Sequence, residues 1–389
     1  MGSDDRYFMF PWADGHTLRD YWSEYPLHQR RLTVIKDAVT QLRGLADGLD
    51  RLHSYQVKTT NSNNPDNQGG TENADGASIS SIRHGDLKPE NILRFIAGEA
   101  TEGSELGVLK IADMGLAKRH VKRTRDRKCV TSTKYGTLQY EGPEIETSLS
   151  PLSRLYDIWS MGCIILDFII WILYGNNELM RFNDDIKRVS NKREQYFEIV
   201  QTEAERGKAI LHKVVRGWMK HIEEKDPECQ QESALRDLLH LVKSQLLVVN
   251  LPRDHDMSGS VGDFVQVTEI PDGSVSSMQA VQIPIIKAED GSYRATAKIL
   301  REKLDEILAK IEDDKDYVLR EKNVEDVNLL KPPDAQSLVT QSDGLLSPNV
   351  GGSGGKQRVS SAFTVFFMVR HSALTVLVPK SNCTSRSIS

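Results

Sequence analysis

The sequence is poor in cysteine, and the few cysteines are widely scattered. Four cysteines occur among 389 residues, and none of their spacings is typical of a metal site. Their positions are Cys129, Cys163, Cys229 and Cys383. The pattern indicates neither a disulfide framework nor a zinc centre, so we expect reduced thiols in an intracellular protein, either cytoplasmic or nuclear.

Long apolar runs are also scarce. Residues 1–6 are polar and acidic, so we expect no cleaved secretory signal. Arg6 breaks the N-myristoylation pattern, which needs Ser or Thr at that position. The apolar run over residues 164–173 is too short for a bilayer and is interrupted by Asp167. We therefore expect a buried helix there and no membrane span.

Neither sign of charge dominates the chain. The formal net charge is -5 and charged residues make up 27% of the sequence, which is typical of a soluble globular protein. This balance produces no global field that would favour nucleic acid as a partner. The length allows one large domain or two ordinary ones, and the sequence does not indicate an oligomeric state.

What the chain does contain is a compact set of polar groups next to two short apolar segments. Residues 84–91 read His-Gly-Asp-Leu-Lys-Pro-Glu-Asn, and residues 108–115 read Val-Leu-Lys-Ile-Ala-Asp-Met-Gly. This order predicts a rigid loop followed by a hairpin, with carboxylates at Asp86 and Asp113. Phosphoryl transfer needs a proton acceptor, a cation for the moving phosphate and oxygens for magnesium. The stretch supplies all three.

The spacing resembles the catalytic loop and the metal-binding motif of eukaryotic protein kinases. Residues 136–144, Gly-Thr-Leu-Gln-Tyr-Glu-Gly-Pro-Glu, resemble the substrate-docking end of a Ser/Thr kinase activation segment. Residues 156–163, Tyr-Asp-Ile-Trp-Ser-Met-Gly-Cys, resemble the start of the central C-lobe helix. Residues 7–22 look like the last N-lobe strand, the hinge and the first C-lobe helix.

The resemblance implies a catalytic role for each matched residue. Asp86 would accept or orient the proton of the attacking hydroxyl, and Lys88 would neutralise charge on the transferred phosphate. The hydroxyl of Thr137 would bridge these two side chains. Asn91 and Asp113 would ligate Mg²⁺. Taken singly, each residue is equally compatible with a surface turn.

The implied nucleotide is ATP, and the resemblance also assigns its contacts. Phe10 would stand at the gatekeeper position, and the backbone of Trp12 and Ala13 would face the adenine. Leu93 would pack beneath the adenine ring. An ordinary strand, turn and helix would account for the same N-terminal stretch.

Two buried contacts are expected from the same resemblance. Asp157 would hold the backbone of the catalytic loop from the start of the central helix. Arg294 would form a buried ion pair with Glu144, and loss of one partner of such a pair costs roughly 3–5 kcal/mol. His84 and Met114 would belong to the buried stack that links the lobes.

The sequence departs from the kinase pattern at two positions. Gly85 stands where many kinases have Arg, so the usual cationic receiver for a phosphorylated activation segment is missing. Activity is then not expected to depend on phosphorylation through that Arg. Met114 replaces the commoner Phe of the metal motif and should preserve packing. The basic run over residues 119–128 fits either a solvated loop or attraction of acidic substrates.

The expected fold class is α+β: a mostly helical, kinase-like C-lobe with a short N-terminal strand and hinge and a small catalytic-loop hairpin. The truncated kinase domain would span residues 1–312, and residues 313–389 would form a largely disordered tail. Two charged amphipathic helices are expected near its C-terminal half, over 192–225 and 231–247. Two inner segments are expected to be a flexible insertion and an extended loop region, at 56–80 and 250–292.

The residues ahead of the hinge are too few to supply a glycine-rich phosphate loop, a strand Lys or a helix Glu. Three hypotheses therefore stand. The first is a Ser/Thr protein kinase that phosphorylates protein Ser/Thr hydroxyls, with activity impaired in this chain. The second is a noncatalytic kinase-like binding module. The third is a small-molecule phosphotransferase, which residues 84–86 allow and residues 136–144 and 156–163 oppose.

Overall fold

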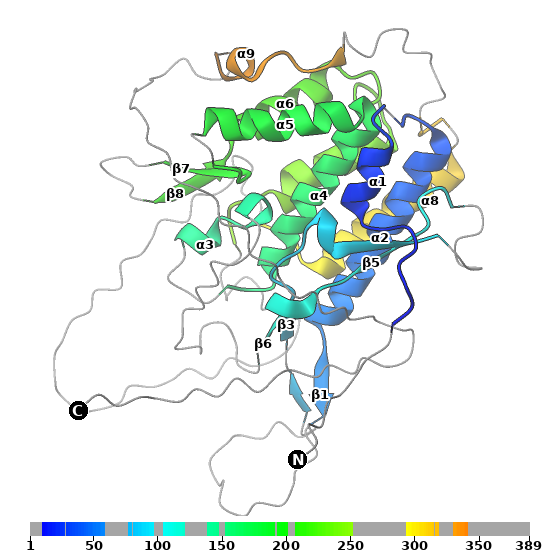
Figure 1. Ribbon diagram of the computed structural model, residues 1–389, viewed down its shortest axis with the longest axis vertical. Coiled ribbons are helices and arrows are strands. Elements are labelled where there is room, and N and C mark those ends of the chain that lie inside the picture. The colour runs from blue at the N-terminus through cyan, green and yellow to red at the C-terminus, as the bar shows by residue number, and fades with distance from the viewer. Residues whose placement is uncertain are drawn as a thin grey trace, which may run out of the picture.

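A computed structural model describes residues 10–27, 29–58, 77–79, 81–96, 104–120, 138–147, 152–190, 193–200, 207–251, 293–314, 316–318 and 330–340 (Figure 1). The helices of this part are α1 (Leu18–Glu24), α2 (Leu32–His53), α3 (Glu144–Thr147), α4 (Leu155–Tyr174), α5 (Asn176–Val189), α6 (Lys213–Lys225), α7 (Ala234–Leu241), α8 (Ala297–Asp313) and α9 (Ala335–Thr340). A π-helical turn, Val242–Leu246, continues α7.

The strands of the described part form antiparallel pairs rather than one continuous sheet. The pairs are β1 (Gln56–Lys58) with β2 (Ala77–Ile79), β3 (Ser81–Arg83) with β6 (Lys118–His120), β4 (Ile92–Phe95) with β5 (Val108–Ile111), and β7 (Phe197–Val200) with β8 (Lys208–Leu211). The combination of many helices with small antiparallel pairs fits the expected α+β class.

The central helix α4 organises the core. All of its residues from Tyr156 to Tyr174 are buried, which a helix that is apolar on every side requires in water. By length and composition alone α4 would be able to cross a membrane, but 94% of its most apolar window is buried inside the protein. Gly175 ends the helix with φ 85°, a conformation that favours glycine. The expected buried helix is confirmed.

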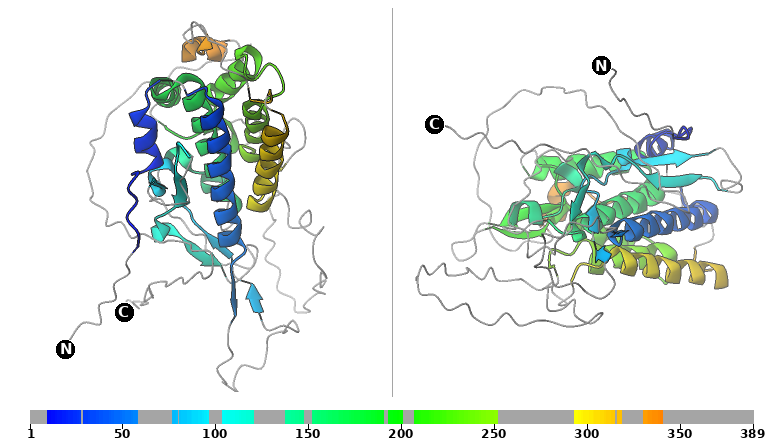
Figure 2. Two further views of the ribbon diagram at one scale, coloured as in Figure 1. Left: turned by 90° about the vertical axis from the view of Figure 1, so that its right-hand side faces the viewer. Right: turned by 90° about the horizontal axis from the view of Figure 1, so that it is seen from below.

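Helices α2 and α8 run side by side along the molecule (Figures 1 and 2). The buried positions of α2 recur at helical spacing and include Ile35, Val39, Leu42, Leu49 and Leu52. The buried face of α8 consists of Ala297, Leu300, Leu304, Ile307 and Ile311. Burial of these apolar faces stabilises this part of the fold.

The β4–β5 hairpin lies between α1 and α2 and carries the catalytic loop at one end. The chain entering α1 pairs with it, because the Gly15 N–H donates to the Arg94 carbonyl at 3.0 Å and the Arg94 N–H donates to the His16 carbonyl at 2.9 Å. On the other side, Asp37 of α2 accepts the Leu106 N–H at 2.9 Å. Both contacts fix the hairpin relative to the helices.

Residues 192–225 do not form the single amphipathic helix that the sequence predicted. Strands β7 and β8 pair in register from Phe197 with Leu211 to Val200 with Lys208, and α6 begins only afterwards. The alternation of apolar and polar residues over Phe-Glu-Ile-Val favours a strand, and Gly207 adopts φ +80° just before β8. The prediction was therefore wrong for the first half of this segment.

The segment 56–80 also differs from the flexible insertion expected for it. Its two ends pair as β1 and β2, from Gln56 with Ile79 to Lys58 with Ala77. Residues 59–76 lie outside the described residues. Most of the extended loop expected over 250–292 is also outside them.

The expectation of a tail from residue 313 onward is wrong for two stretches. Val318 is 1% exposed, and Leu338 of α9 is 5% exposed. A side chain at Gly217 of α6 would meet Leu338 at 3.1 Å, so the bare glycine makes room for α9. His221 of α6 also contacts the Leu330 carbonyl at 2.8 Å. Apolar burial and these contacts order α9 against α6, whereas residues 341–389 lie outside the described part.

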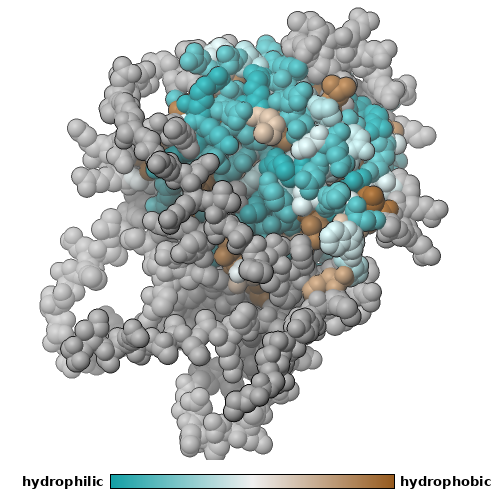
Figure 3. All heavy atoms as spheres, in the orientation of Figure 1, coloured by the Kyte–Doolittle hydropathy of each residue, from teal (hydrophilic) through white to brown (hydrophobic). Residues whose placement is uncertain are grey.

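The described surface is mainly hydrophilic in the view of Figure 3. Its large exposed apolar side chains come from many separate elements: Phe10, Trp12, Tyr25, Leu27, Leu32, Ile96, Leu138, Met180 and Ile299. The cysteines of the described part, Cys163 and Cys229, are buried free thiols, as the sequence predicted.

Candidate active site

The loop over residues 84–91, which resembles a kinase catalytic loop, is held by the buried carboxylate of Asp157. Its two oxygens accept the backbone N–H groups of His84 and Gly85, each at 2.9 Å. The ring nitrogen Nε2 of His53 contacts the same carboxylate at 2.8 Å. Burial by itself raises the pKa of the Asp157 carboxyl, but the hydrogen bond with His53 and the N–H of Gly85 bring that pKa below its usual range. The predicted anchoring role of Asp157 is confirmed.

The backbone of the loop turns sharply after His84. The Asp86 N–H donates to Nδ1 of His84 at 3.2 Å, so Nε2 carries the ring proton and donates to the Ala112 carbonyl at 2.9 Å. Gly85 adopts φ +84°, which favours glycine, and a side chain there would meet the Leu116 carbonyl at 3.2 Å. The backbone conformation at this position therefore favours glycine over the arginine that many kinases have there.

Two of the predicted site residues contact the carboxylate of a third. Nζ of Lys88 lies 3.0 Å from Oδ2 of Asp86. The Asn91 amide nitrogen donates to the Asp86 carbonyl at 2.8 Å and to Oδ2 of Asp86 at 3.0 Å. The Ala112 N–H donates to the Asn91 carbonyl at 2.8 Å, which ties the loop to the end of β5. The ammonium and the carboxamide thus both contact Oδ2 of Asp86.

Asp113 follows β5 and is bonded to this loop through its neighbour Ala112. It adopts φ 58°, and its Oδ1 accepts the Gly115 N–H at 3.1 Å. The amide nitrogen of Asn91 points to Asp86, which leaves Oδ1 as the ligand atom of that carboxamide. Mg²⁺ prefers a few such hard oxygen ligands together with water and phosphate oxygens, so Asn91 and Asp113 fit a magnesium site of this kind. In the described ranges no group of three or more His, Cys, Asp or Glu side chains is arranged for a metal.

The predicted nucleotide contacts lie on the segment that precedes α1. Phe10 is 37% exposed and Trp12 is 83% exposed, whereas Ala13 is half-buried. Leu93 is half-buried on β4 and pairs with Thr17 in an isolated bridge. The hinge-like segment and Leu93 therefore belong to neighbouring parts of the fold. The strand predicted over residues 7–10 falls almost entirely outside the described residues.

Thr137 lies outside the described residues, and so does most of the basic run over 119–128. The structure describes the residues on either side of this region, since β6 ends at His120 and a 3₁₀ turn, Leu138–Tyr140, begins directly after Thr137. The bridging role predicted for Thr137 stays a prediction.

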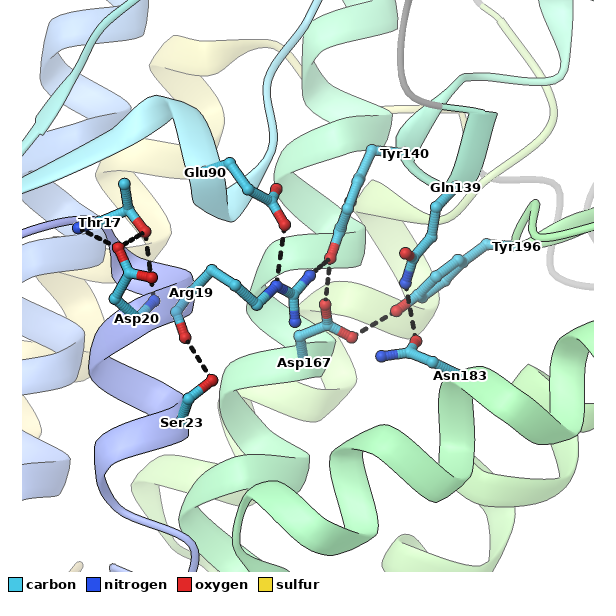
Figure 4. A network of polar contacts seen from close by, with 10 residues as sticks. All are labelled: Thr17, Arg19, Asp20, Ser23, Glu90, Gln139, Tyr140, Asp167, Asn183 and Tyr196. Carbon is cyan, nitrogen blue, oxygen red and sulfur yellow. Dashed lines mark hydrogen bonds and ion pairs between the residues drawn. The ribbon is translucent and has the colours of Figure 1, made fainter. Parts of the chain in front are cut away.

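A polar network next to the catalytic loop was not predicted from the sequence (Figure 4). Nε of Arg19 donates to Oε1 of Glu90 at 3.0 Å, and its Nη2 donates to the Tyr140 hydroxyl at 2.5 Å. That hydroxyl donates to Oδ2 of Asp167 at 2.7 Å, and the Tyr196 hydroxyl donates to Oδ1 of the same residue. Burial raises the pKa of the Asp167 carboxyl to about 6. The interruption of an apolar run by Asp167 was the only sequence signal for this network.

Two further buried charges near the loop were also missed. Arg83 is 1% exposed, its guanidinium lies over the Tyr156 ring at 5.4 Å, and its Nε and Nη1 have no hydrogen-bond partner in the described structure. Burial lowers the pKa of Arg83. Glu141 is 4% exposed, and burial, with Glu146 and Asp86 nearby, raises the pKa of its carboxyl to about 7.

Comparison with known proteins shows what the part of the chain around this site is similar to. Residues 79–246 match the protein kinase domain. The chain is 36% identical over 85 residues to the serine/threonine-protein kinase chk-2 of Caenorhabditis elegans, covering 22% of this chain and 15% of that protein. It is 38% identical over 96 residues to the serine/threonine-protein kinase RAD53 of Saccharomyces cerevisiae, covering 22% of this chain and 10% of that protein. Residues 79–246 are thus similar to a eukaryotic-type protein kinase domain, and these two relatives are Ser/Thr kinases.

A third relative shows the same partial coverage. The chain is 37% identical over 91 residues to the probable cyclin-dependent kinase 8 of Dictyostelium discoideum, which covers 23% of this chain and 21% of that protein. The chain therefore matches much less than two thirds of the length of these curated relatives.

Proposed function

We propose that this chain supplies the C-lobe of a Ser/Thr protein kinase that transfers the γ-phosphate of ATP to Ser or Thr hydroxyls of a protein substrate. One observation carries the proposal. The Asp86 carboxylate lies 3.0 Å from both the Lys88 ammonium and the Asn91 amide nitrogen, on a loop whose backbone is bonded to the buried Asp157. A purely structural turn would need no such convergence of an acid, a cation and an amide.

In this proposal the protein acts mainly by positioning and by electrostatics. Asp86 accepts or orients the proton of the acceptor hydroxyl, and the Asn91 amide holds the carboxylate in one orientation. Lys88 offsets negative charge on the phosphate that moves. The bonds from His84 and Gly85 to Asp157 keep the loop backbone fixed, so little reorganisation is needed during transfer.

Asn91 and Asp113 would hold Mg²⁺, which neutralises phosphate charge when it is bound. Phe10, Leu93 and the backbone of Trp12 and Ala13 would contact the adenine, and Thr137 would bridge Asp86 and Lys88.

The test is calorimetric titration of magnesium–ATP into this chain and into an Asp113→Ala variant. Asp305→Ala is the matched control, because Asp305 is an exposed carboxylate on α8 that pairs with Arg43. Binding that is lost only in Asp113→Ala, together with phosphorylation of protein and not of sugars or antibiotics, is the expected result. Absence of binding in all three proteins, with partner proteins still bound, would favour a noncatalytic binding module instead.

A further inference from the structure

Residues 330–340, which end in α9, lie on a surface made by α5 and α6 (Figure 1). We call this surface the α5–α6 face and define it by the residues that contact the segment: Glu178, Arg181, Arg188, Gly217 and His221. The segment buries three apolar side chains: Pro332, Ala335 and Leu338. Leu338 packs over Gly217, where any side chain would crowd it.

Two side chains of the face donate to the backbone of the segment. Nη2 of Arg181 donates to the Pro332 carbonyl at 2.7 Å. Nε2 of His221 donates to the Leu330 carbonyl at 2.8 Å. These carbonyls lie two residues apart and would be present in any segment of similar conformation. Main-chain bonds combined with pockets for a few side chains are typical of sites that bind linear peptides.

Charged side chains add a preferred order of residues to this backbone recognition. Nζ of Lys331 lies 3.2 Å from Oε1 of Glu178, and Oδ1 of Asp334 lies 2.9 Å from Nη2 of Arg188. The face therefore presents an acid and a base that match a cation and an anion three residues apart. A ligand with these two charges exchanged would meet like charges at both positions.

The face is held by contacts that do not involve the segment. Trp218 of α6 packs against Tyr174 of α4 and Phe182 of α5, with ring centroids 6.2 and 5.2 Å apart. Helix α9, in contrast, has six residues, and a helix of that length is not stable in water without packing. We therefore expect α5 and α6 to keep their arrangement when the segment leaves.

The segment also leaves one polar atom of this region without a partner. Asp185 of α5 is 2% exposed, and its Oδ2 has no hydrogen-bond partner in the described structure. Nη2 of Arg188 contacts both Asp185 and Asp334, so two carboxylates share one guanidinium. A different segment that donates to Asp185 would gain a hydrogen bond that residues 330–340 do not make.

We propose that the α5–α6 face is a docking site for a linear segment of a partner protein, and that residues 330–340 are an internal ligand which this segment replaces. The partner segment carries Lys-Pro-x-Asp, then a small residue, then Leu three residues further on. The inference goes beyond the proposed phosphotransfer and does not depend on it. A fixed structural role for α9 makes a different prediction, because α9 would then open only when the whole domain unfolds.

Hydrogen exchange of the full chain tests whether the internal ligand detaches. Amides of α9 are expected to exchange at least about ten-fold faster than those of α4, through a local opening whose rate does not depend on low concentrations of denaturant. Exchange of α9 and α4 at one common rate would overturn the proposal.

Binding of a free peptide tests the face itself. A fluorescent peptide with the sequence of residues 330–340 is titrated into the wild type, into Leu338→Asp and into Leu338→Asp combined with Gly217→Val. Leu338→Asp removes an anchor of the internal ligand, so it should bind the peptide about ten-fold more tightly than the wild type, whose own segment competes. Gly217→Val fills the space for Leu338 and should abolish this binding. Equal binding by the first two proteins, no binding by any, or binding that persists with Gly217→Val would overturn the proposal.

A variant with exchanged charges covers the case in which Leu338→Asp does not fold. Lys331→Glu combined with Asp334→Lys weakens the internal ligand without any change in the apolar core, and it should also bind the peptide more tightly than the wild type does. Failure of this variant to do so would equally overturn the proposal.

Altered peptides test the chemistry expected of the partner. Alanine at positions 333, 336 and 337 should change the affinity less than about three-fold, whereas exchange of the charges at 331 and 334 should weaken it about ten-fold. Glu178→Lys combined with Arg188→Glu should restore binding of the charge-exchanged peptide. Affinity that is indifferent to this exchange would overturn the assigned partner. Light scattering of the wild type at rising concentration supplies the last check, because a dimer formed by exchange of the segment would assign the face to a second copy instead.

Discussion

Arg294 and Glu144 form a buried ion pair across 150 residues of sequence, with Nη1 of the arginine 2.7 Å from Oε1 of the glutamate. The same guanidinium donates to the Val248 carbonyl at 2.8 Å and lies over the Trp159 ring at 5.0 Å. It therefore connects α3 and α4 to the chain just before α8. The pair was predicted from the sequence and is confirmed.

Replacement of Arg294 by alanine is expected to destabilise the protein by roughly 3–5 kcal/mol, because the Glu144 carboxylate would be left buried without its cation. Chemical denaturation of the wild type and the variant measures this difference. Arg43→Ala is the control, and loss of its exposed ion pair should cost at most about 1 kcal/mol. Equal effects of the two substitutions would contradict the assigned role of Arg294.

Gly85→Ala is expected to destabilise the protein by about 1–2 kcal/mol, because φ at Gly85 is +84° and a side chain there would crowd the Leu116 carbonyl. For Gly44→Ala in α2 we predict the opposite effect on stability. A side chain at Gly44 meets nothing within 4 Å, so alanine should stabilise the helix by about 0.5–1 kcal/mol. Thermal unfolding of both variants checks the two signs together.

Arg83→Met is expected to stabilise the protein by about 1–2 kcal/mol, since it removes a buried cation whose Nε and Nη1 have no hydrogen-bond partner in the described structure. Arg94→Met is the matched control, because Nε of the buried Arg94 donates to the Leu106 carbonyl at 2.7 Å. This second variant should be less stable than the wild type. Denaturant midpoints distinguish the cases, and destabilisation by Arg83→Met would show that the contact of the guanidinium with the Tyr156 ring outweighs its missing hydrogen bonds.

Glu141 should make the free energy of unfolding depend on pH. Burial, together with Glu146 and Asp86, raises the pKa of its carboxyl from 4.5 to about 7. The folded protein then binds this proton more tightly than the unfolded chain does, so the free energy of unfolding falls as the pH rises from about 4.5 to 7.

Glu141→Gln removes this titration. At pH above 7 the variant should be more stable than the wild type by about 1–2 kcal/mol, a value reduced for screening by solvent. Denaturation curves across this pH range give the slope directly. Glu223→Gln, at an exposed glutamate that pairs with Lys243, should leave the slope unchanged. A wild-type slope retained in Glu141→Gln would rule out Glu141 as its source.

The sequence predicted those parts of the fold that depend on short motifs with fixed spacing. The loop held by Asp157, the hairpin that ends before Asp113 and the buried helix α4 are of this kind. It predicted the distant pair of Arg294 with Glu144, which belongs to the same motifs, but not the contacts of Arg19 with Glu90 and Tyr140, which lie 71 and 121 residues away.

The largest error in the predicted fold came from treating charge and helical spacing as sufficient evidence for a helix. Residues 197–211 contain enough charge to look like a solvated helix, yet they pair as β7 and β8 because cross-strand contacts decide the outcome. Thr137 and the nucleotide contacts of Phe10, Trp12 and Ala13 remain predictions, because they depend on a bound ligand or lie outside the described residues.

The close approach of Leu338 to Gly217 has a practical consequence for C-terminal truncation of this protein. A fragment ending at residue 312, where the kinase resemblance stops, would uncover the face of α6 that α9 protects and would break the bond between His221 and the Leu330 carbonyl. Within the described part of the chain, a piece that keeps this face of α6 covered therefore extends to residue 340. Its C-terminal limit is set by the glycine at position 217, which lets a distant helix approach.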